Sequence, residues 1–144
     1  MNNNLEQLYR QVIMEHYKNP KNKGLINDEG YYTVHLNNPS CGDDVNVQFK
    51  IVDDVIVDIK HSGIGCSMCC SSASIMSETL KGKTTKEALE IIDNFYELVK
   101  GEKVNDKVDL GESVVYTGVS KFPARIKCVT LSWKAVEKGI NDKK

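Results

Sequence analysis

The sequence predicts an α+β domain in which helices pack on one face of a small antiparallel sheet of about three strands. Apolar residues alternate strictly from Val45 to Ile51 and again from Val55 to His61, with Asp53-Asp54 as a tight turn between them. This pattern is typical of an antiparallel hairpin. Segments before and after it repeat apolar residues at spacings of three and four, which is typical of helices.

Length and composition are those of one compact domain over residues 1–144. A hydrophobic content of 40% is enough for a core without disulfides. The net charge of −1 gives no electrostatic reason for a nucleic-acid partner. The start of the chain lacks the pattern of a signal peptide, and no apolar run approaches the roughly 18 residues of a membrane span. We therefore expect a cytoplasmic protein with neither nucleic acid nor membrane as a partner.

The first helix is predicted over residues 5–18, where one apolar face is followed by Asn19-Pro20. Residues 18–30 are polar and carry glycine and proline, so they are expected to form a surface connection. Residues 31–36 are rich in β-branched and aromatic side chains and form the first expected strand.

Two helices are predicted after the hairpin. One runs over residues 67–81 and ends at Gly82, with small residues dominating its first half. The next is introduced by Thr84 and Glu87 at the spacing of a capping box and closes at Gly101.

Residues 102–117 are charged and lack helical periodicity, so we predict a surface insertion there. A last helix is expected to start at Ser120-Lys-Phe-Pro123, with proline in its first turn, and to end at Gly139. Cys128 lies one to two turns into it, and the rotation of the helix decides where its thiol points.

Three of the five cysteines fall in the stretch Gly63-Ile-Gly-Cys66-Ser-Met-Cys69-Cys70. An odd number of cysteines without an export signal favours metal binding or catalysis over disulfides. Cys66 is predicted to be exposed at a helix N-terminus, where the helix dipole favours the thiolate.

Cys41 precedes the hairpin and Cys66 follows it, so antiparallel pairing brings the two side by side. With Asp43 and Cys128 they form a candidate tetrahedral site of three thiolates and one carboxylate, donors that suit zinc. The alternative is that Cys41 is a loop thiol and Cys128 a small buried side chain.

Cys66-Ser-Met-Cys69 also has the spacing of a thioredoxin-like redox pair. The antiparallel hairpin that precedes it disfavours this interpretation, because a thioredoxin-like sheet requires alternating strands and helices. We expect Cys69 and Cys70 to replace small residues on the buried face of the helix.

The remaining titratable residues are expected to pack or to face solvent. The three histidines are His16, His35 and His61, of which His61 lies nearest the cysteine segment. Three cations lie close to Cys128 in the sequence, namely Lys121, Arg125 and Lys127. They would lower the pKa of the thiol or contact acidic groups of a partner. The alternative is that they form an exposed helix face.

Three cysteine motifs resemble those of the IscU/SufU family of iron-sulfur cluster assembly proteins. They are, in order, Asn-Asn-Pro-Ser-Cys41-Gly-Asp43, Gly-Ile-Gly-Cys66-Ser, and Lys-Phe-Pro-Ala-Arg125-Ile-Lys-Cys128. The resemblance includes the opening Leu-Tyr-Arg-Gln-Val-Ile-Met-Glu-His-Tyr-Lys-Asn-Pro20 and covers nearly the whole chain. The segment 102–117 resembles an insertion of the SufU branch, and Lys127 stands where the IscU branch carries histidine.

The resemblance to the SufU branch implies a zinc-dependent sulfurtransferase. Its implied zinc ligands are Cys41, Asp43, Cys66 and Cys128, with Cys41 as the catalytic thiol that accepts persulfide sulfur. The implied partners are a SufS-type cysteine desulfurase, a histidine of which replaces Cys41 at zinc, and downstream iron-sulfur assembly proteins. The IscU branch implies the alternative, a scaffold on which an iron-sulfur cluster is assembled and passed on.

Cys69 and Cys70 depart from the family pattern, which has mostly small residues other than cysteine there. They would be alternative metal ligands, sulfur acceptors or supports for a cluster. The interpretation we favour is again that both are small buried side chains.

Overall fold

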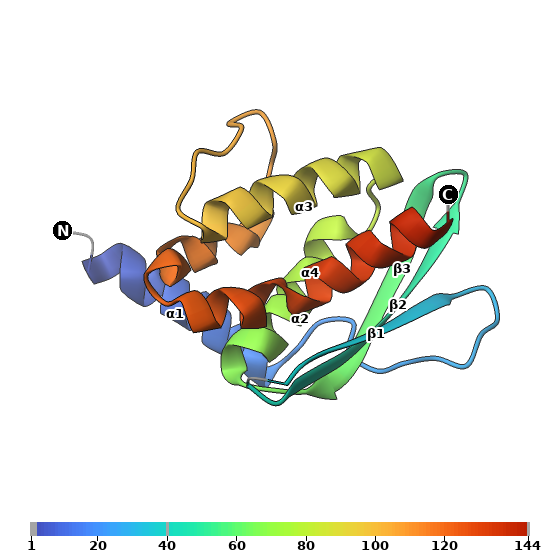
Figure 1. Cartoon of the computed structure of the whole chain (residues 1–144), viewed down its shortest axis with the longest axis horizontal. Coiled ribbons are helices and arrows are strands. Elements are labelled where there is room, and N and C mark those ends of the chain that lie inside the picture. The colour runs from blue at the N-terminus through green and yellow to red at the C-terminus, as the bar shows by residue number, and fades with distance from the viewer. Residues whose placement is uncertain (1–2, 40, 144) are drawn as a thin grey trace.

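The structure is a computed structural model that describes residues 3–39 and 41–143. Its elements follow the predicted order (Figure 1), and their bounds are α1 Asn3–Lys18, β1 Tyr32–Asn38, β2 Asp43–Val52, β3 Val55–Ile64, α2 Ser67–Leu80, α3 Thr85–Val99, the 3-10 helix η1 Gly111–Lys121 and α4 Pro123–Lys143.

The sheet has the order β1-β2-β3 and both pairs of strands are antiparallel. Asp53 and Asp54 both have positive φ, 52° and 65°, and form the two-residue turn between β2 and β3. Positive φ at both positions gives the turn a twist that matches the strands on either side. The predicted hairpin is confirmed. Both of its strands run a few residues further than the alternation indicated, so that Asp43 belongs to β2.

The helices lie on one face of the sheet, with α4 crossing the strands and α2 and α3 beside it (Figure 1). The core forms where these helices meet the inward side chains of β2 and β3. Phe95 of α3 stacks on Trp133 of α4 with ring centroids 4.0 Å apart, and both side chains are fully buried. On the other face, the connection after α1 covers Gln48. The side-chain amide of Gln48 accepts a hydrogen bond from the backbone N–H of Ile26 and donates one to its backbone oxygen.

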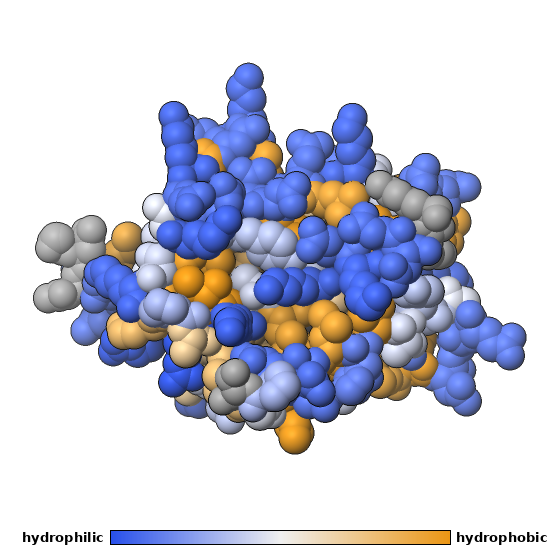
Figure 2. Space-filling view, viewed as in Figure 1, coloured by the Kyte–Doolittle hydropathy of each residue, from blue (hydrophilic) through white to orange (hydrophobic). Residues whose placement is uncertain are grey.

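Polar side chains cover most of the face that carries α3 and α4, with small apolar patches between them (Figure 2). Within the part of the chain that the structure describes, no helix is both long enough and apolar enough to cross a bilayer.

The prediction of a surface insertion over residues 102–117 is wrong for its second half. Residues 102–109 form a mostly exposed loop, but η1 begins at Gly111 and packs against α3 and α2. Ser113, Tyr116 and Val119 are buried. These side chains recur every three residues, which is the period of a 3-10 helix and differs from the period of 3.6 that indicates an α-helix.

The prediction that the last helix ends at Gly139 is wrong. Gly139 lies inside α4, which continues to Lys143. A Cβ at position 139 would lie 2.4 Å from the Phe49 ring and 3.1 Å from a methyl of Val34. Gly139 therefore allows α4 to approach the sheet closely, and it is not a stop signal.

We predict that Gly139→Ala lowers the free energy of unfolding by about 1–3 kcal/mol, because the added methyl group overpacks the interface between α4 and the sheet. Helix propensity alone would favour alanine by about 1 kcal/mol, so a loss of stability would show that overpacking outweighs propensity. Urea denaturation measures it. Gly118→Ala is the control, because a Cβ there has no atom within 4 Å. A Gly139→Ala chain as stable as the wild type would contradict the packing described here.

Candidate metal centre

The cysteine site forms where the start of β2 lies beside the end of β3. Asp44 pairs with Ile64 in the register of the two strands, so the residues on either side of this pair are neighbours. Gly63 has a φ of +152°, and a Cβ there would lie 2.0 Å from the backbone oxygen of Asp44. Only glycine allows this approach, which brings the segment leading to Cys66 next to Asp43.

The rotation of α4, which the sequence left open, is set by buried polar contacts with α2. The hydroxyl of Ser72 donates to the backbone oxygen of Val129 at 2.5 Å and accepts from the indole N–H of Trp133 at 2.9 Å. Since these groups are buried, their hydrogen bonds strongly favour one arrangement of the two helices. In this arrangement Cys128 faces the cysteines and Asp43.

The structure brings the ligand atoms of three predicted ligands together, and the fourth predicted ligand, Cys66, contacts Asp43 through its backbone. One ligand atom from each of Cys41, Asp43 and Cys128 lies within 4.8 Å of the others. Cys66 is the N-cap of α2, and its backbone N–H donates to Oδ1 of Asp43 at 3.1 Å. Asp43 is only 1% exposed, and its Oδ2 is buried without a hydrogen-bond partner among the described residues.

The electrostatics of this cluster favour a bound cation. Burial raises the pKa of the Cys128 thiol, and Asp43, Cys41 and Cys66 raise it further. A divalent cation among these groups would lower the pKa of the thiols, because it stabilises thiolates. It would also give the buried Oδ2 of Asp43 a partner. Together with the thiol of Cys66 at the N-cap of α2, these groups would make a donor set of three sulfur atoms and one carboxylate oxygen, which fits a zinc ion.

Cys69 and Cys70 lie beside this cluster. Cys69 is buried against Val45 and Leu131, and burial followed by the charge of Asp43 raises its thiol pKa. The Cys70 thiol is half-buried, donates to the backbone oxygen of Gly65 at 3.6 Å, and has a pKa that burial raises. The prediction of a buried side chain is confirmed for Cys69 and holds only in part for Cys70.

The remaining sequence-predicted residues lie outside the cluster. His35 is exposed and pairs with Asp44 at 2.8 Å. His61 is buried, its Nε2 lies 2.8 Å from the backbone oxygen of Lys21, and burial lowers its pKa. Arg125 and Lys127 are exposed on α4, and within residues 3–39 and 41–143 neither forms an ion pair.

One group of possible ligands was missed by the sequence reasoning. His16, Glu78 and Glu112 also bring three ligand atoms within 4.8 Å of one another. They come from three separate helices, and no local spacing links them.

Comparison with known proteins gives one consistent family. Residues 8–142 match the family described as the NifU-like N terminal domain. The chain is 50% identical to the zinc-dependent sulfurtransferase SufU of Bacillus subtilis over 96% of this chain and 93% of that protein. It is 40% identical to the iron-sulfur cluster assembly scaffold protein IscU of Streptococcus pyogenes over 94% of this chain and 84% of that protein.

A solved structure agrees with these relatives. The crystal structure of a candidate iron-sulfur cluster assembly scaffold protein of the SUF system from Fervidobacterium islandicum has a TM-score of 0.85 and 34% identity. The match covers 94% of this chain and 98% of that one.

We predict that Gly65→Ala weakens metal retention while leaving the fold intact. A Cβ at position 65 would lie 2.6 Å from Oδ1 of Asp43 and 3.2 Å from the Cβ of Cys69, so the carboxylate must move. Displacing a group that supports a metal site costs roughly tenfold or more in metal affinity. Zinc transfer to a chromophoric chelator measures the effect, with circular dichroism to verify the fold and Gly118→Ala as the control. Equal transfer from both variants would show that Gly65 does not position Asp43.

Proposed function

The chain belongs to the family of NifU-like N-terminal domains, and we propose that it is a zinc-dependent sulfurtransferase of iron-sulfur cluster assembly. The observation that carries this proposal is the buried carboxylate of Asp43. One of its oxygens has no hydrogen-bond partner among the described residues, and the carboxylate lies with the thiols of Cys41 and Cys128 and accepts from the backbone N–H of Cys66. The 50% identity to a zinc-dependent sulfurtransferase supports it over nearly the full length of both chains.

We assign the zinc ligands to Cys41, Asp43, Cys66 and Cys128. Bound zinc would keep the thiol ligands deprotonated at neutral pH. Cys128 is fully buried and Cys66 is half-buried, whereas Cys41 is exposed on the turn between β1 and β2. Exposure makes Cys41 the thiol that a second protein can reach, so we assign it as the sulfur acceptor.

The transfer is an exchange of one sulfur–sulfur bond for another. The Cys41 thiolate attacks the terminal sulfur of a persulfide on the donor protein, and a bond forms between that sulfur and Sγ of Cys41. The bond inside the donor persulfide breaks, and its electron pair leaves on the donor cysteine as a thiolate. No net oxidation occurs, and Cys41 carries the persulfide afterwards.

The donor we propose is a cysteine desulfurase of the SufS type, with iron-sulfur assembly proteins as later acceptors. Arg125 and Lys127 are exposed in the first turns of α4, close in sequence to Cys128. Two exposed cations there would suit acidic groups on the donor protein. All five cysteines are free, which supports a reducing compartment such as the cytoplasm.

The second candidate function is a scaffold for an iron-sulfur cluster. The similarity to scaffold proteins favours it, as do the two additional thiols of Cys69 and Cys70 beside the site. Elemental analysis and the visible spectrum of protein purified without oxygen separate the two functions. We expect colourless protein that contains zinc. Brown protein with broad visible absorption and little zinc would overturn the sulfurtransferase proposal.

We predict that Cys41→Ser abolishes stimulation of the cognate desulfurase, because it removes the accepting thiol. Cys69→Ser and Cys70→Ser are the matched controls and should retain most of the stimulation, since neither residue is assigned as a ligand or an acceptor. The rate of sulfide or alanine production by the desulfurase measures the effect. If Cys69→Ser is as inactive as Cys41→Ser, the proposed ligand set is wrong.

A further inference from the structure

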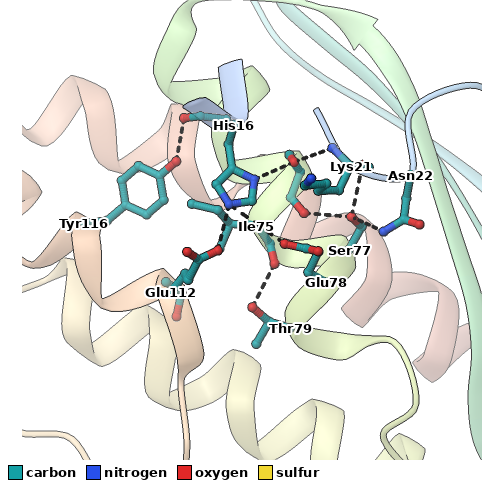
Figure 3. A network of polar contacts seen from close by, with 12 residues as sticks. His16, Lys21, Asn22, Ile75, Ser77, Glu78, Thr79, Glu112 and Tyr116 are labelled. Atoms are coloured by element: carbon teal, nitrogen blue, oxygen red, sulfur yellow. Dashed lines mark hydrogen bonds and ion pairs between the residues drawn. The ribbon is translucent and has the colours of Figure 1, made fainter. Parts of the chain in front are cut away.

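A second group of metal-ligating side chains lies at the other end of α2 from the cysteine site. It consists of His16 from α1, Glu78 from the last turn of α2 and Glu112 from η1, and we refer to it as the His16 cluster (Figure 3). The Nε2 of His16 lies 2.8 Å from Oε1 of Glu112 and 3.9 Å from Oε1 of Glu78. The histidine side chain is 6% exposed and the glutamates are 44% and 54% exposed.

The surroundings of His16 allow its Nε2 to act as a ligand. Its Nδ1 lies 2.7 Å from Oγ of Ser74, which also accepts the backbone N–H of Lys21 at 2.7 Å. A serine hydroxyl can accept two hydrogen bonds, so the imidazole proton can reside on Nδ1. Nε2 then turns a lone pair toward two carboxylates, and a cation bound between them would stabilise this arrangement. Histidines that bind metals typically donate their other N–H to an oxygen in this way.

The competing arrangement is a plain hydrogen-bonded histidine. If the hydroxyl of Ser74 donates to Nδ1, the imidazole proton resides on Nε2 and is donated to Glu112. No ion is then needed, in line with the packing role that the sequence predicts for His16. The two arrangements differ in whether a metal ion binds at Nε2, which can be measured.

The cluster opens on a cavity that attracts cations. This cavity has a volume of about 330 Å³ and is lined by Glu78, Thr79, Lys83, Asp109, Gly111 and Glu112. Three carboxylates oppose one ammonium group in this lining, so the local charge is negative. A metal ion can reach both glutamates from solvent without any rearrangement of the core, and water can complete its coordination.

We propose that His16, Glu78 and Glu112 bind a divalent transition-metal ion in a site separate from the cysteine site. A ligand set of one imidazole and two carboxylates suits Zn²⁺, Mn²⁺, Fe²⁺ and Co²⁺. With metal–ligand distances of about 2.1 Å in tetrahedral geometry, the ligand atoms would lie about 3.4 Å apart. Binding therefore requires the contact with Glu112 to lengthen slightly and that with Glu78 to shorten, and both half-exposed side chains can rotate to do so. The ion would tie α1, α2 and η1 together.

The test is binding of cobalt by the full chain after its cysteine site has been loaded with zinc. Zinc holds that site more tightly than cobalt, so added cobalt reports on other sites. We expect about one further metal ion per chain by elemental analysis after equilibrium dialysis. Its spectrum should show weak ligand-field bands without sulfur-to-cobalt charge transfer, because no thiolate takes part. Glu78→Gln and Glu112→Gln should each weaken this binding roughly tenfold or more.

Glu90→Gln is the matched control, since it removes the same charge from an exposed position on α3 that belongs neither to the cluster nor to the cavity lining. A Cys41→Ser chain should retain the second site, so the two sites are measured independently. The proposal is overturned if no cobalt binds beyond the zinc, or if the binding is equally strong in the Glu78→Gln, Glu112→Gln and Glu90→Gln chains. The latter result would mean adventitious binding only.

Discussion

Burial of the Asp43 carboxylate is the constraint on which the functional part of this structure depends. A carboxylate removed from water costs several kcal/mol unless charge or hydrogen bonds compensate it. Here the backbone N–H of Cys66 satisfies one oxygen, and the residues that the structure describes supply no hydrogen-bond partner for the other. The surrounding thiols would add negative charge if they ionised. Glycines at positions 63 and 65 nevertheless bring the chain close to this group, so the fold builds a site that is balanced only when a cation or protons are present.

Helix α2 connects the two groups of possible ligands. It begins at the N-cap Cys66, holds α4 through Ser72 in its middle, and presents Ser74 and Glu78 to His16 near its end. Its weak apolar stripe has a simple cause, because four of its nine buried residues are serines, whose hydroxyl groups form hydrogen bonds with neighbouring helices and loops. Small residues allow close packing on several sides, and their hydroxyl groups orient the neighbouring elements.

The exposure of the thiols differs across the cysteine site in a way that suits sulfur transfer. Cys128 and Cys69 are buried on helices, where a thiol is held in place and shielded from other proteins. Cys41 lies on a turn between two strands and is exposed. The site thus combines buried thiols with one exposed thiol that another protein can reach, which is the combination that the proposed sulfur transfer needs.

The sequence by itself determined the hairpin, the helix starts at Ser67 and Thr85, and the convergence of Cys41 and Cys66, because alternation, caps and antiparallel pairing are local rules. Tertiary structure alone decided that Cys128 faces the site, that η1 packs as a 3-10 helix, and that His16 meets Ser74 and Glu112, which lie 58 and 96 residues away along the chain. These arrangements depend on how helices rotate and pack against one another. Contacts between distant segments set that rotation, and no pattern within a single segment encodes it.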